Sequence, residues 1–282
     1  MEFVMKRQVV ATGLTGTIGR YLQPHVVDLN IRLSESVDHI QSLLDNNIVI
    51  HLAAVVGEEN VRRDLTHSYK VNVTGALELA RVTQRSQALR FVYVSTSHVY
   101  ERSQKPKLLD ESSAVLPQGQ YALQKLLAEE LICDVFRNDP SRLIIARVFS
   151  VLYPTQPRGT LGHSIKELLQ DKSRLLKCAD DERDFLSPQV IARALSSLAV
   201  SKNAFGKVNV CSGKPLTIRE AVRCVVGNRA FDRIRHQLIA GQSPTPRIVG
   251  SPRRLEQLTG LSSAELLQNS VNDWDAARTE SE

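Results

Sequence analysis

The chain has 282 residues, a formal net charge of +6, and apolar and charged shares close to those of ordinary soluble globular proteins. This length allows one large core or two joined ones, and no apolar run approaches the roughly 18 residues that span a bilayer. The first seven residues lack the long apolar segment of a secretory signal, so we expect a cytoplasmic protein with no membrane partner.

Positive charge gathers between Arg229 and Arg254, where Asp232 is the one acidic residue among several arginines. Such a segment could meet the phosphates of a nucleotide ligand or of nucleic acid, or it could be a solvated surface. Aromatic residues are not interleaved with these charges as in single-strand binders, so we expect no nucleic-acid partner. The four cysteines have no metal-ligand spacing, and we expect no metal site.

A glycine-rich turn follows the first expected strand. Residues 8–12 are apolar and β-branched, and Gly13, Gly16 and Gly19 come directly after them. A strand that ends in this spacing and opens a helix brings backbone amides against a pyrophosphate. Gly13 and Gly16 would permit the tight turn, and Gly19 would let the helix pack on the sheet. The pattern favours dinucleotide binding over a flexible turn.

The next stretch is short for such a unit. Pro24 disfavours continuation of the helix, and residues 25–33 form a plausible second strand. Asp28, Asn30 and Arg32 compete for the place that contacts the adenosine ribose. NAD and NADP therefore both stay open, with NAD slightly preferred.

Expected strands and helices alternate from there to residue 150. We expect helices at 34–46 (capped by Ser34 or Ser36), 68–86 and 121–137, and strands at 47–55, 90–94 and 142–149. In the helix at 121–137 we expect an apolar core stripe of Leu123, Leu127, Leu131 and Val135. A long loop at 101–120 would lie over the site. The alternation predicts an α/β fold with a doubly wound parallel sheet, similar to a Rossmann fold.

Tyr121 and Lys125 lie four residues apart on the third of these helices, so both would project from one face. An ammonium beside a phenol can lower its pKa and let it exchange a proton with a substrate hydroxyl. The spacing alone would also suit a surface pair. The hydroxyl residues that follow the strand at 90–94 stand at a carboxyl end, where ligands bind in such sheets.

The pattern loosens beyond residue 150. We expect helices near 162–170 and 188–200, a strand at 207–211, a helix capped by Thr217, and a polar helical tail over 252–274. Residues 1–150 would form the dinucleotide-binding domain. Residues 151–282 would mainly form a smaller α/β substrate-binding region, with about 186–212 packing back on the first domain.

Eight motifs in order resemble the extended short-chain dehydrogenase/reductase family, in particular its nucleotide-sugar epimerase/dehydratase branch. They are Thr12-Gly13 with Gly16 and Gly19, His51-Leu52-Ala53-Ala54, Asn72 with Gly75, Ser95-Thr96-Ser97 with Val99-Tyr100, Tyr121 with Lys125, Arg147 with Phe149, Arg183-Asp184-Phe185, and Ser212-Gly213-Lys214. The resemblance covers nearly the whole chain.

The resemblance implies that Tyr121 is the acid/base, that Lys125 lowers its pKa and holds the nicotinamide ribose, and that Thr96 is the partner hydroxyl. Substrate contacts would come from Ser97, His98 and Arg183, the last at a sugar-nucleotide diphosphate. Arg183 could instead form a surface salt bridge with Asp181 or Glu182, and His98 could be an incidental loop residue. The full set expected to bind NAD or NADP is Gly13, Thr15, Gly16, Thr17, Ile18, Gly19, Asp28, Arg32, Leu52, Ala53, Ala54, Asn72, Tyr121 and Lys125. The resemblance also implies a homodimer formed through a helix bundle that includes the Tyr121 helix.

Departures from the family pattern reduce the number of reactions that the resemblance allows. Dehydratases of the family carry acidic residues directly after the threonine, whereas this chain has Ser97 and His98. We therefore expect an NAD(P)-dependent oxidoreductase or epimerase of a nucleotide-activated sugar, acting by C4 epimerisation or 4-keto reduction. The alternative is a non-catalytic protein of the same fold that senses dinucleotide or binds RNA.

Overall fold

The computed structural model describes residues 8–22, 26–32, 37–102, 107–153, 160–241 and 247–279. Six parallel strands form the central sheet in the order β2-β1-β3-β4-β5-β9. These strands are β1 Val9–Thr12, β2 Val26–Asp28, β3 Ile48–His51, β4 Arg90–Thr96, β5 Leu143–Val148 and β9 Gly206–Val210. The expected doubly wound parallel sheet is confirmed.

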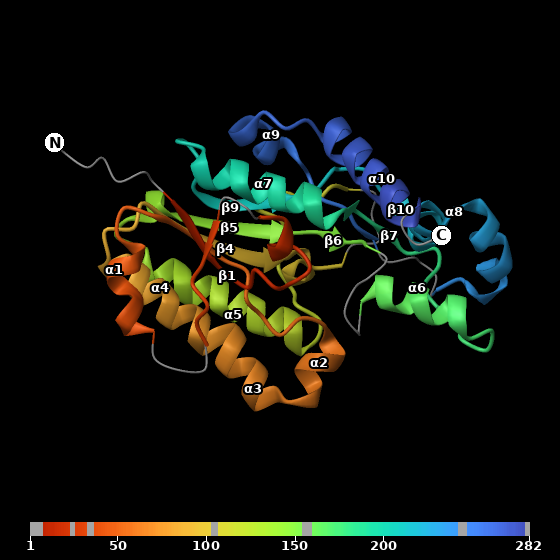
Figure 1. Cartoon of the computed structure of the whole chain (residues 1–282), viewed down its shortest axis with the longest axis horizontal. Coiled ribbons are helices and arrows are strands. Elements are labelled where there is room, and N and C mark those ends of the chain that lie inside the picture. The colour runs from red at the N-terminus through yellow and green to blue at the C-terminus, as the bar shows by residue number, and fades with distance from the viewer. Residues whose placement is uncertain are drawn as a thin grey trace.

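Helices cover both faces of this sheet (Figure 1). On one face lie α1 (Gln41–Leu44), α4 (Ala76–Arg85) and α5 (Gln120–Val135). On the other lie α7 (Pro188–Val200), α9 (Arg253–Thr259) and α10 (Ser263–Thr279). Each face has its own buried apolar cluster, so the sheet strands are buried on both sides, as a parallel sheet requires.

The first crossover is as short as the sequence indicates. Among its described residues it holds one 3-10 turn, η1 (Gly19–Tyr21), before β2 begins at Val26. The helix expected at 34–46 is shorter: a 3-10 turn, η2 (Asp38–Ile40), leads into the single turn of α1. Ser34 and Ser36, its expected caps, lie outside the described residues.

The segment between β3 and β4 holds more helix than expected. α2 (Glu58–Arg63) was not predicted, and the helix expected from Ser68 begins three residues earlier, in α3 (Leu65–Tyr69). A π-helical turn, η3 (Lys70–Gly75), joins α3 to α4. α2 has no apolar stripe because charged side chains occupy most of it, with acids in its first turn and bases in its last, which complements the helix dipole.

The core stripe expected on α5 is wrong for Leu123 and Leu127, whereas Val135 packs against the buried apolar cluster on this face of the sheet. Leu123 and Leu127 are 49% and 37% exposed, whereas Lys125, Ala128 and Glu129 are buried. The prediction assigned burial by apolarity, but the buried lysine and glutamate find polar partners inside the protein. Those partners, the Val94 carbonyl and Arg147, lie on the neighbouring strands β4 and β5.

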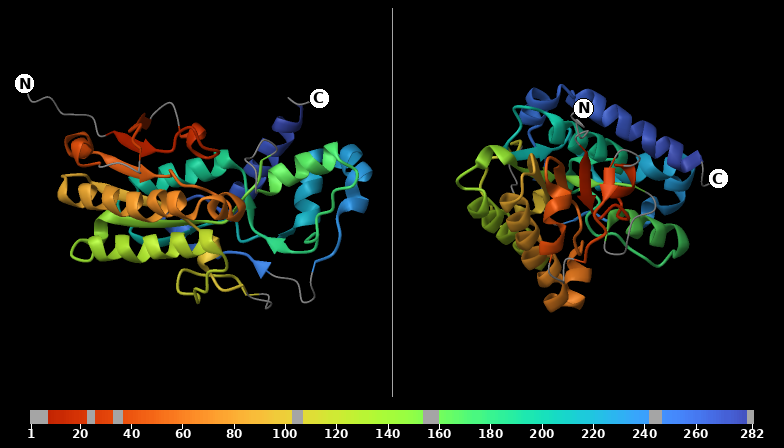
Figure 2. Two further views of the ribbon diagram at one scale, coloured as in Figure 1. Left: turned by 90° about the horizontal axis from the view of Figure 1, so that it is seen from below. Right: turned by 60° about the vertical axis from the view of Figure 1, so that its left-hand side comes forward.

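Several segments beyond β5 form a smaller region beside the carboxyl ends of the strands (Figure 2). Its helices are α6 (Leu161–Gln170) and α8 (Ile218–Ile234), and Thr217 caps α8 in a capping box with Glu220. Its short strands are β6 Ser150–Val151, β7 Glu182–Arg183, β8 Phe185–Leu186, β10 Leu216–Thr217 and β11 Arg247–Ile248. The chain returns to the central sheet in α7 and β9.

Asp184 links three segments of this region through hydrogen bonds to its side chain. Its fully buried carboxylate accepts hydrogen bonds from the backbone N–H and the hydroxyl of Ser212, both at 2.8 Å, and from Gly213 N–H at 2.7 Å. Gly250 N–H lies 3.4 Å from the same carboxylate. Burial nevertheless raises the pKa of Asp184 to about 6, against the opposing effect of these donors.

The expected helical tail consists of two helices, α9 and α10. Gly260 stands between α9 and α10 with φ of +73°, a left-handed conformation that ends α9. Trp274 of α10 is fully buried and donates from Nε1 to the Leu152 carbonyl at 2.7 Å. No helix in the described part of the chain is both long enough and apolar enough to cross a membrane.

Candidate functional site

The glycine turn packs its backbone directly against the end of β3. Gly13 has φ of +78°, and a Cβ there would lie 2.6 Å from the backbone nitrogen of Ala53. A Cβ on Gly19 would overlap the Gly13 carbonyl oxygen and lie 2.7 Å from Leu14 Cα. Both positions therefore admit no side chain, and the turn approaches the neighbouring strand as closely as a dinucleotide-binding turn requires.

A cavity of about 1180 Å³ opens in front of this turn. It reaches from the glycine turn past the carboxyl ends of β3, β4 and β5 to residues of the smaller region, including Arg183 and Ile218. The predicted site residues that line it are Gly13, Thr15, Gly16, Thr17, Ile18, Gly19, Arg32, Leu52, Ala53, Ala54, Thr96, His98, Tyr121, Lys125 and Arg183. The structure thus brings most of the predicted site together.

Three predicted residues do not line this cavity: Asp28, Asn72 and Ser97. Asp28 accepts the Asn30 backbone N–H at 2.9 Å, whereas Arg32 lines the cavity. Asn72 is buried, and its side chain accepts the backbone N–H of Val55. It also donates to the Val55 carbonyl and to the side-chain oxygen of Gln124. Asn72 therefore holds Val55, which lines the cavity, without lining the cavity itself. Ser97 is buried in the turn after β4.

Lys125 is 3% exposed and enters the cavity wall from α5. Its ammonium donates to the Val94 carbonyl at 2.7 Å and lies 4.1 Å from the centroid of the Tyr93 ring. Burial lowers the pKa of Lys125 to about 7, and the Glu129 carboxylate opposes that change. The lysine is thus held over β4, the strand that ends in Thr96.

Tyr121 is the second residue of α5 and lines the same cavity. Burial raises its pKa to about 12, opposite to the lowering expected from the lysine. The phenol is therefore protonated at neutral pH. A protonated phenol is suited to donate a proton to an oxygen that is gaining negative charge.

Cationic side chains gather at the other end of the cavity. Arg183 pairs with Asp181 at 3.0 Å and is mostly buried, and its Nη1 has no hydrogen-bond partner within the described ranges. Burial, Arg183 and Arg102 together lower the pKa of His98 to about 4. His98 is therefore a neutral imidazole at neutral pH, beside a cationic surface that suits phosphate oxygens.

Glu58 is a cavity residue that sequence reasoning missed. It opens α2, and its carboxylate reaches across to the first turn of α5, 62 residues later. The nearest sequence signal is Gly57, whose φ of +88° starts α2, but nothing in the sequence indicates the partner.

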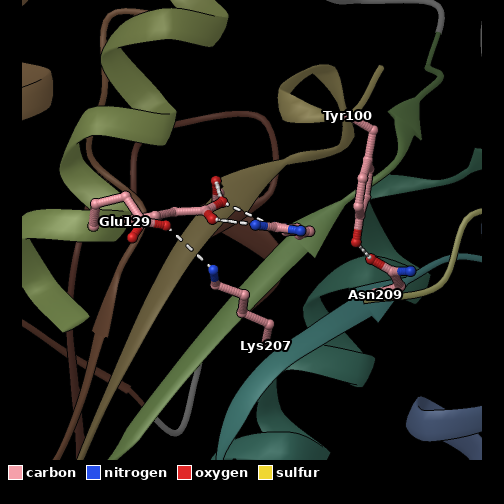
Figure 3. A network of polar contacts seen from close by, with 7 residues as sticks. Tyr100, Glu129, Lys207 and Asn209 are labelled. Carbon is pink, nitrogen blue, oxygen red and sulfur yellow. Dashed lines mark hydrogen bonds and ion pairs between the residues drawn. The ribbon is translucent and has the colours of Figure 1, made fainter. Parts of the chain in front are cut away.

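A buried polar network lies beneath the site (Figure 3). Arg147 of β5 donates from Nη2 to Glu129 at 2.6 Å and from Nε to both carboxylate oxygens, and Ser95 also donates to Glu129. The guanidinium lies 4.7 Å from the Tyr100 ring centroid, and the Tyr100 hydroxyl donates to Asn209 at 2.7 Å. The network ties α5 to β4, β5 and β9, and so fixes the helix that carries Tyr121 and Lys125.

A sequence model of the NAD dependent epimerase/dehydratase family matches residues 13–211, well over half of the chain. The chain belongs to this family. GDP-6-deoxy-D-mannose reductase of Pseudomonas aeruginosa is 25% identical over 299 residues, which cover 96% of this chain and 98% of that protein. UDP-glucose 4-epimerase 2 of Oryza sativa subsp. japonica is 31% identical over 159 residues, covering 55% of this chain and 37% of that protein.

Solved structures have the same fold. The RMD protein of Pseudomonas aeruginosa, complexed with NADPH, has a TM-score of 0.72 at 24% identity over 96% of this chain and 99% of its own. MoeE5, complexed with UDP-glucose and NAD, has a TM-score of 0.75 at 19% identity, covering 95% of this chain and 98% of its own. This chain is accordingly an NAD(P)-dependent enzyme of the nucleotide-sugar epimerase and reductase type. The relatives named here are all enzymes, and nothing in them supports a non-catalytic dinucleotide sensor or RNA-binding protein.

The cavity fits a dinucleotide. Gly13, Gly16 and Gly19 line the cavity and carry no side chains, which leaves the backbone of the turn open to a pyrophosphate, and Arg32 provides a cation at the β2 side of the cavity. Within the described residues no cluster of three or more potential metal ligands occurs.

Proposed function

We propose that this enzyme is an NADPH-dependent reductase of a nucleotide-activated 4-keto sugar. The observation that carries the proposal is the match to GDP-6-deoxy-D-mannose reductase, which spans almost the whole of both chains. The match to UDP-glucose 4-epimerase 2 covers about half of this chain.

The proton chemistry of the site supports reduction. In such a reduction, a bound nicotinamide would supply a hydride to the carbonyl carbon, and the carbonyl oxygen would need to gain a proton. Tyr121 supplies that proton, since its phenol lines the cavity and is protonated at neutral pH. Thr96 donates a hydrogen bond to the same oxygen, and Lys125 holds the ribose next to the reacting centre. Arg183 binds the diphosphate of the nucleotide-sugar and His98 contacts the sugar.

Turnover of a defined substrate tests this proposal. GDP-6-deoxy-D-mannose with NADP⁺ is expected to give NADPH, the reverse of the proposed reduction, measured by absorbance. Tyr121→Phe should lower kcat by a factor of about 10² to 10⁴ while NADPH affinity changes less than about twofold. Conversion of UDP-glucose to its C4 epimer without added cofactor, together with no NADPH formation, would instead establish an epimerase.

Arg32 supports the choice of NADPH. At the end of the second strand, an acidic residue favours the free ribose hydroxyls of NAD, whereas an arginine accommodates the 2′-phosphate of NADP. Here Arg32 lines the cavity and Asp28 does not. Arg32→Ser should weaken NADPH binding about tenfold or more and leave NADH binding within about twofold. Arg63→Ser, on an exposed arginine of α2, is the control. Equal losses for both cofactors would contradict the assignment.

We further propose a homodimer in the cytoplasm. Leu123 and Leu127 expose apolar surface on α5, the helix through which such a dimer would form. Leu127→Asp should yield a monomer by light scattering, whereas Leu169→Asp, on exposed α6, should not. Unchanged mass for Leu127→Asp would refute this dimer. The four unpaired cysteines are typical of a reducing compartment.

A further inference from the structure

The first turn of α5 lacks a cap of its own. The residue before the helix is Gly119, which has φ of +98° and no side chain to satisfy the free N–H groups of the first turn. The helix nevertheless begins with Gln120 and Tyr121, and Tyr121 carries the proton in the proposed function.

Glu58 supplies the missing cap from another helix. Its Oε1 accepts the backbone N–H of Gln120 and its Oε2 accepts the backbone N–H of Tyr121, each at 3.0 Å. Arg62, one turn later on α2, forms an ion pair with the same carboxylate, with 2.5 Å between Arg62 Nε and Glu58 Oε1. Burial alone would raise the pKa of Glu58, but the two backbone donors and Arg62 hold that pKa below its usual range. The carboxylate is therefore ionised at neutral pH, the form that a helix N-terminus stabilises.

Gly119 makes room for this contact. A Cβ at Gly119 would lie 2.6 Å from Glu58 Oε2 and 2.8 Å from its Cδ. Gly119 and Glu58 both line the cavity, so the cap stands at the wall of the site. Glu58, the first residue of α2, and Gly119, the residue before α5, are distant in sequence and are thus matched to each other beside Tyr121.

We propose that Glu58 is a positioning residue for Tyr121, holding the first turn of α5 so that the phenol meets the reacting oxygen. Glu58 donates no proton to substrate in this role. It acts through the backbone of Tyr121, and its effect is on alignment. Misplacement of a reacting group by about 1 Å can cost about 10² in rate. This inference rests on the proposed function insofar as Tyr121 is the proton donor.

The test compares Glu58→Ala and Glu58→Gln with Glu59→Gln. Glu59 is the adjacent glutamate of α2, and its ion pair with Arg63 is exposed, at 3.8 Å. Three measurements are made on the full-length protein: amide hydrogen exchange of the first turn of α5, the ¹³Cζ resonance of Tyr121 assigned with Tyr121→Phe, and turnover of GDP-6-deoxy-D-mannose with NADP⁺.

We expect Glu58→Ala to speed exchange at Gln120 and Tyr121, to shift the Tyr121 resonance, and to lower kcat by about tenfold or more. The KM for NADP⁺ should stay within about twofold. Glu58→Gln, which keeps an amide oxygen as acceptor, should recover part of the rate, and Glu59→Gln should match the wild type. If Glu58→Ala folds poorly, Gly119→Ala takes its place, because the added Cβ displaces the carboxylate without removing it. Gly119→Ala should then show the changes expected of Glu58→Ala.

Wild-type exchange rates and an unmoved Tyr121 resonance in Glu58→Ala would overturn the inference. A shifted resonance with unchanged kcat would also overturn it, because the turn would then be placed by Glu58 without consequence for the reaction. If the wild type does not oxidise GDP-6-deoxy-D-mannose, the proposed substrate is wrong. Exchange and the Tyr121 resonance then still decide whether Glu58 places Tyr121.

Discussion

The buried ion pair between Glu129 and Arg147 gives the sharpest stability prediction. Both side chains are almost fully buried, at 0% and 1% exposed, and three nitrogen–oxygen contacts of 2.6 to 3.2 Å join them. Glu129→Ala would leave the Arg147 guanidinium in the protein interior without its counter-charge. Breaking such a pair costs about 3–5 kcal/mol of unfolding free energy.

Urea unfolding followed by the fluorescence of the single tryptophan, the buried Trp274, measures this cost. The control is Asp134→Ala, which removes a carboxylate from the same helix. Its partner Arg137 lies at 3.3 Å, and both side chains are 71% exposed. The control should cost less than about 1 kcal/mol.

The double variant Glu129→Leu with Arg147→Met tests whether the unpaired charge of Arg147 causes the loss of stability in Glu129→Ala. If the orphaned charge causes it, the double variant should be more stable than Glu129→Ala, because neither ion stays buried. A Glu129→Ala cost no larger than that of Asp134→Ala would refute the reasoning. A double variant less stable than Glu129→Ala would also refute it.

Three further predictions concern pH and the glycine turn. Because burial raises the folded-state pKa of Asp184 to about 6, its contribution to stability is fully present below about pH 4. That contribution should fall by up to about 3 kcal/mol as the pH rises to 6, and urea unfolding of Asp184→Asn should lack this slope. Lys125 has the opposite sign: burial lowers its folded-state pKa to about 7, so stability should rise between pH 7 and 10 in the wild type. Lys125→Met should abolish that rise, and an unchanged slope would contradict the assignment. Gly19→Ala should weaken NADPH binding at least tenfold in fluorescence titrations because its Cβ would overlap the Gly13 carbonyl. Wild-type affinity in this variant would show that the turn can relax.

The sheet could be predicted from the sequence because its strands are short apolar runs at regular spacing. The strands at 90–94 and 142–149 are close to β4 and β5, and the expected helix at 188–200 matches α7. Local chemistry also located Thr217 as a helix cap. These features depend on residues that are near one another along the chain.

The errors arise where distant residues decide the outcome. The leucines of α5 were expected in the core, yet Lys125 and Glu129 occupy that face because Val94 and Arg147 provide their partners. Glu58 could not be found because its partners are the backbone amides of a helix 62 residues away. The choice between Asp28 and Arg32 required the direction of the chain after β2, which the sequence leaves open.

The contact of Trp274 with Leu152 has a consequence for how the chain is made. Synthesis proceeds from the N-terminus, so Leu152 leaves the ribosome 122 residues before the indole that binds its carbonyl. β5 likewise waits for β9, and until then it is an open sheet edge of the kind that pairs with other chains. Folding of this enzyme is therefore completed only after translation has passed Trp274, and until β9 is made the nascent chain exposes a strand edge on which aggregation can begin.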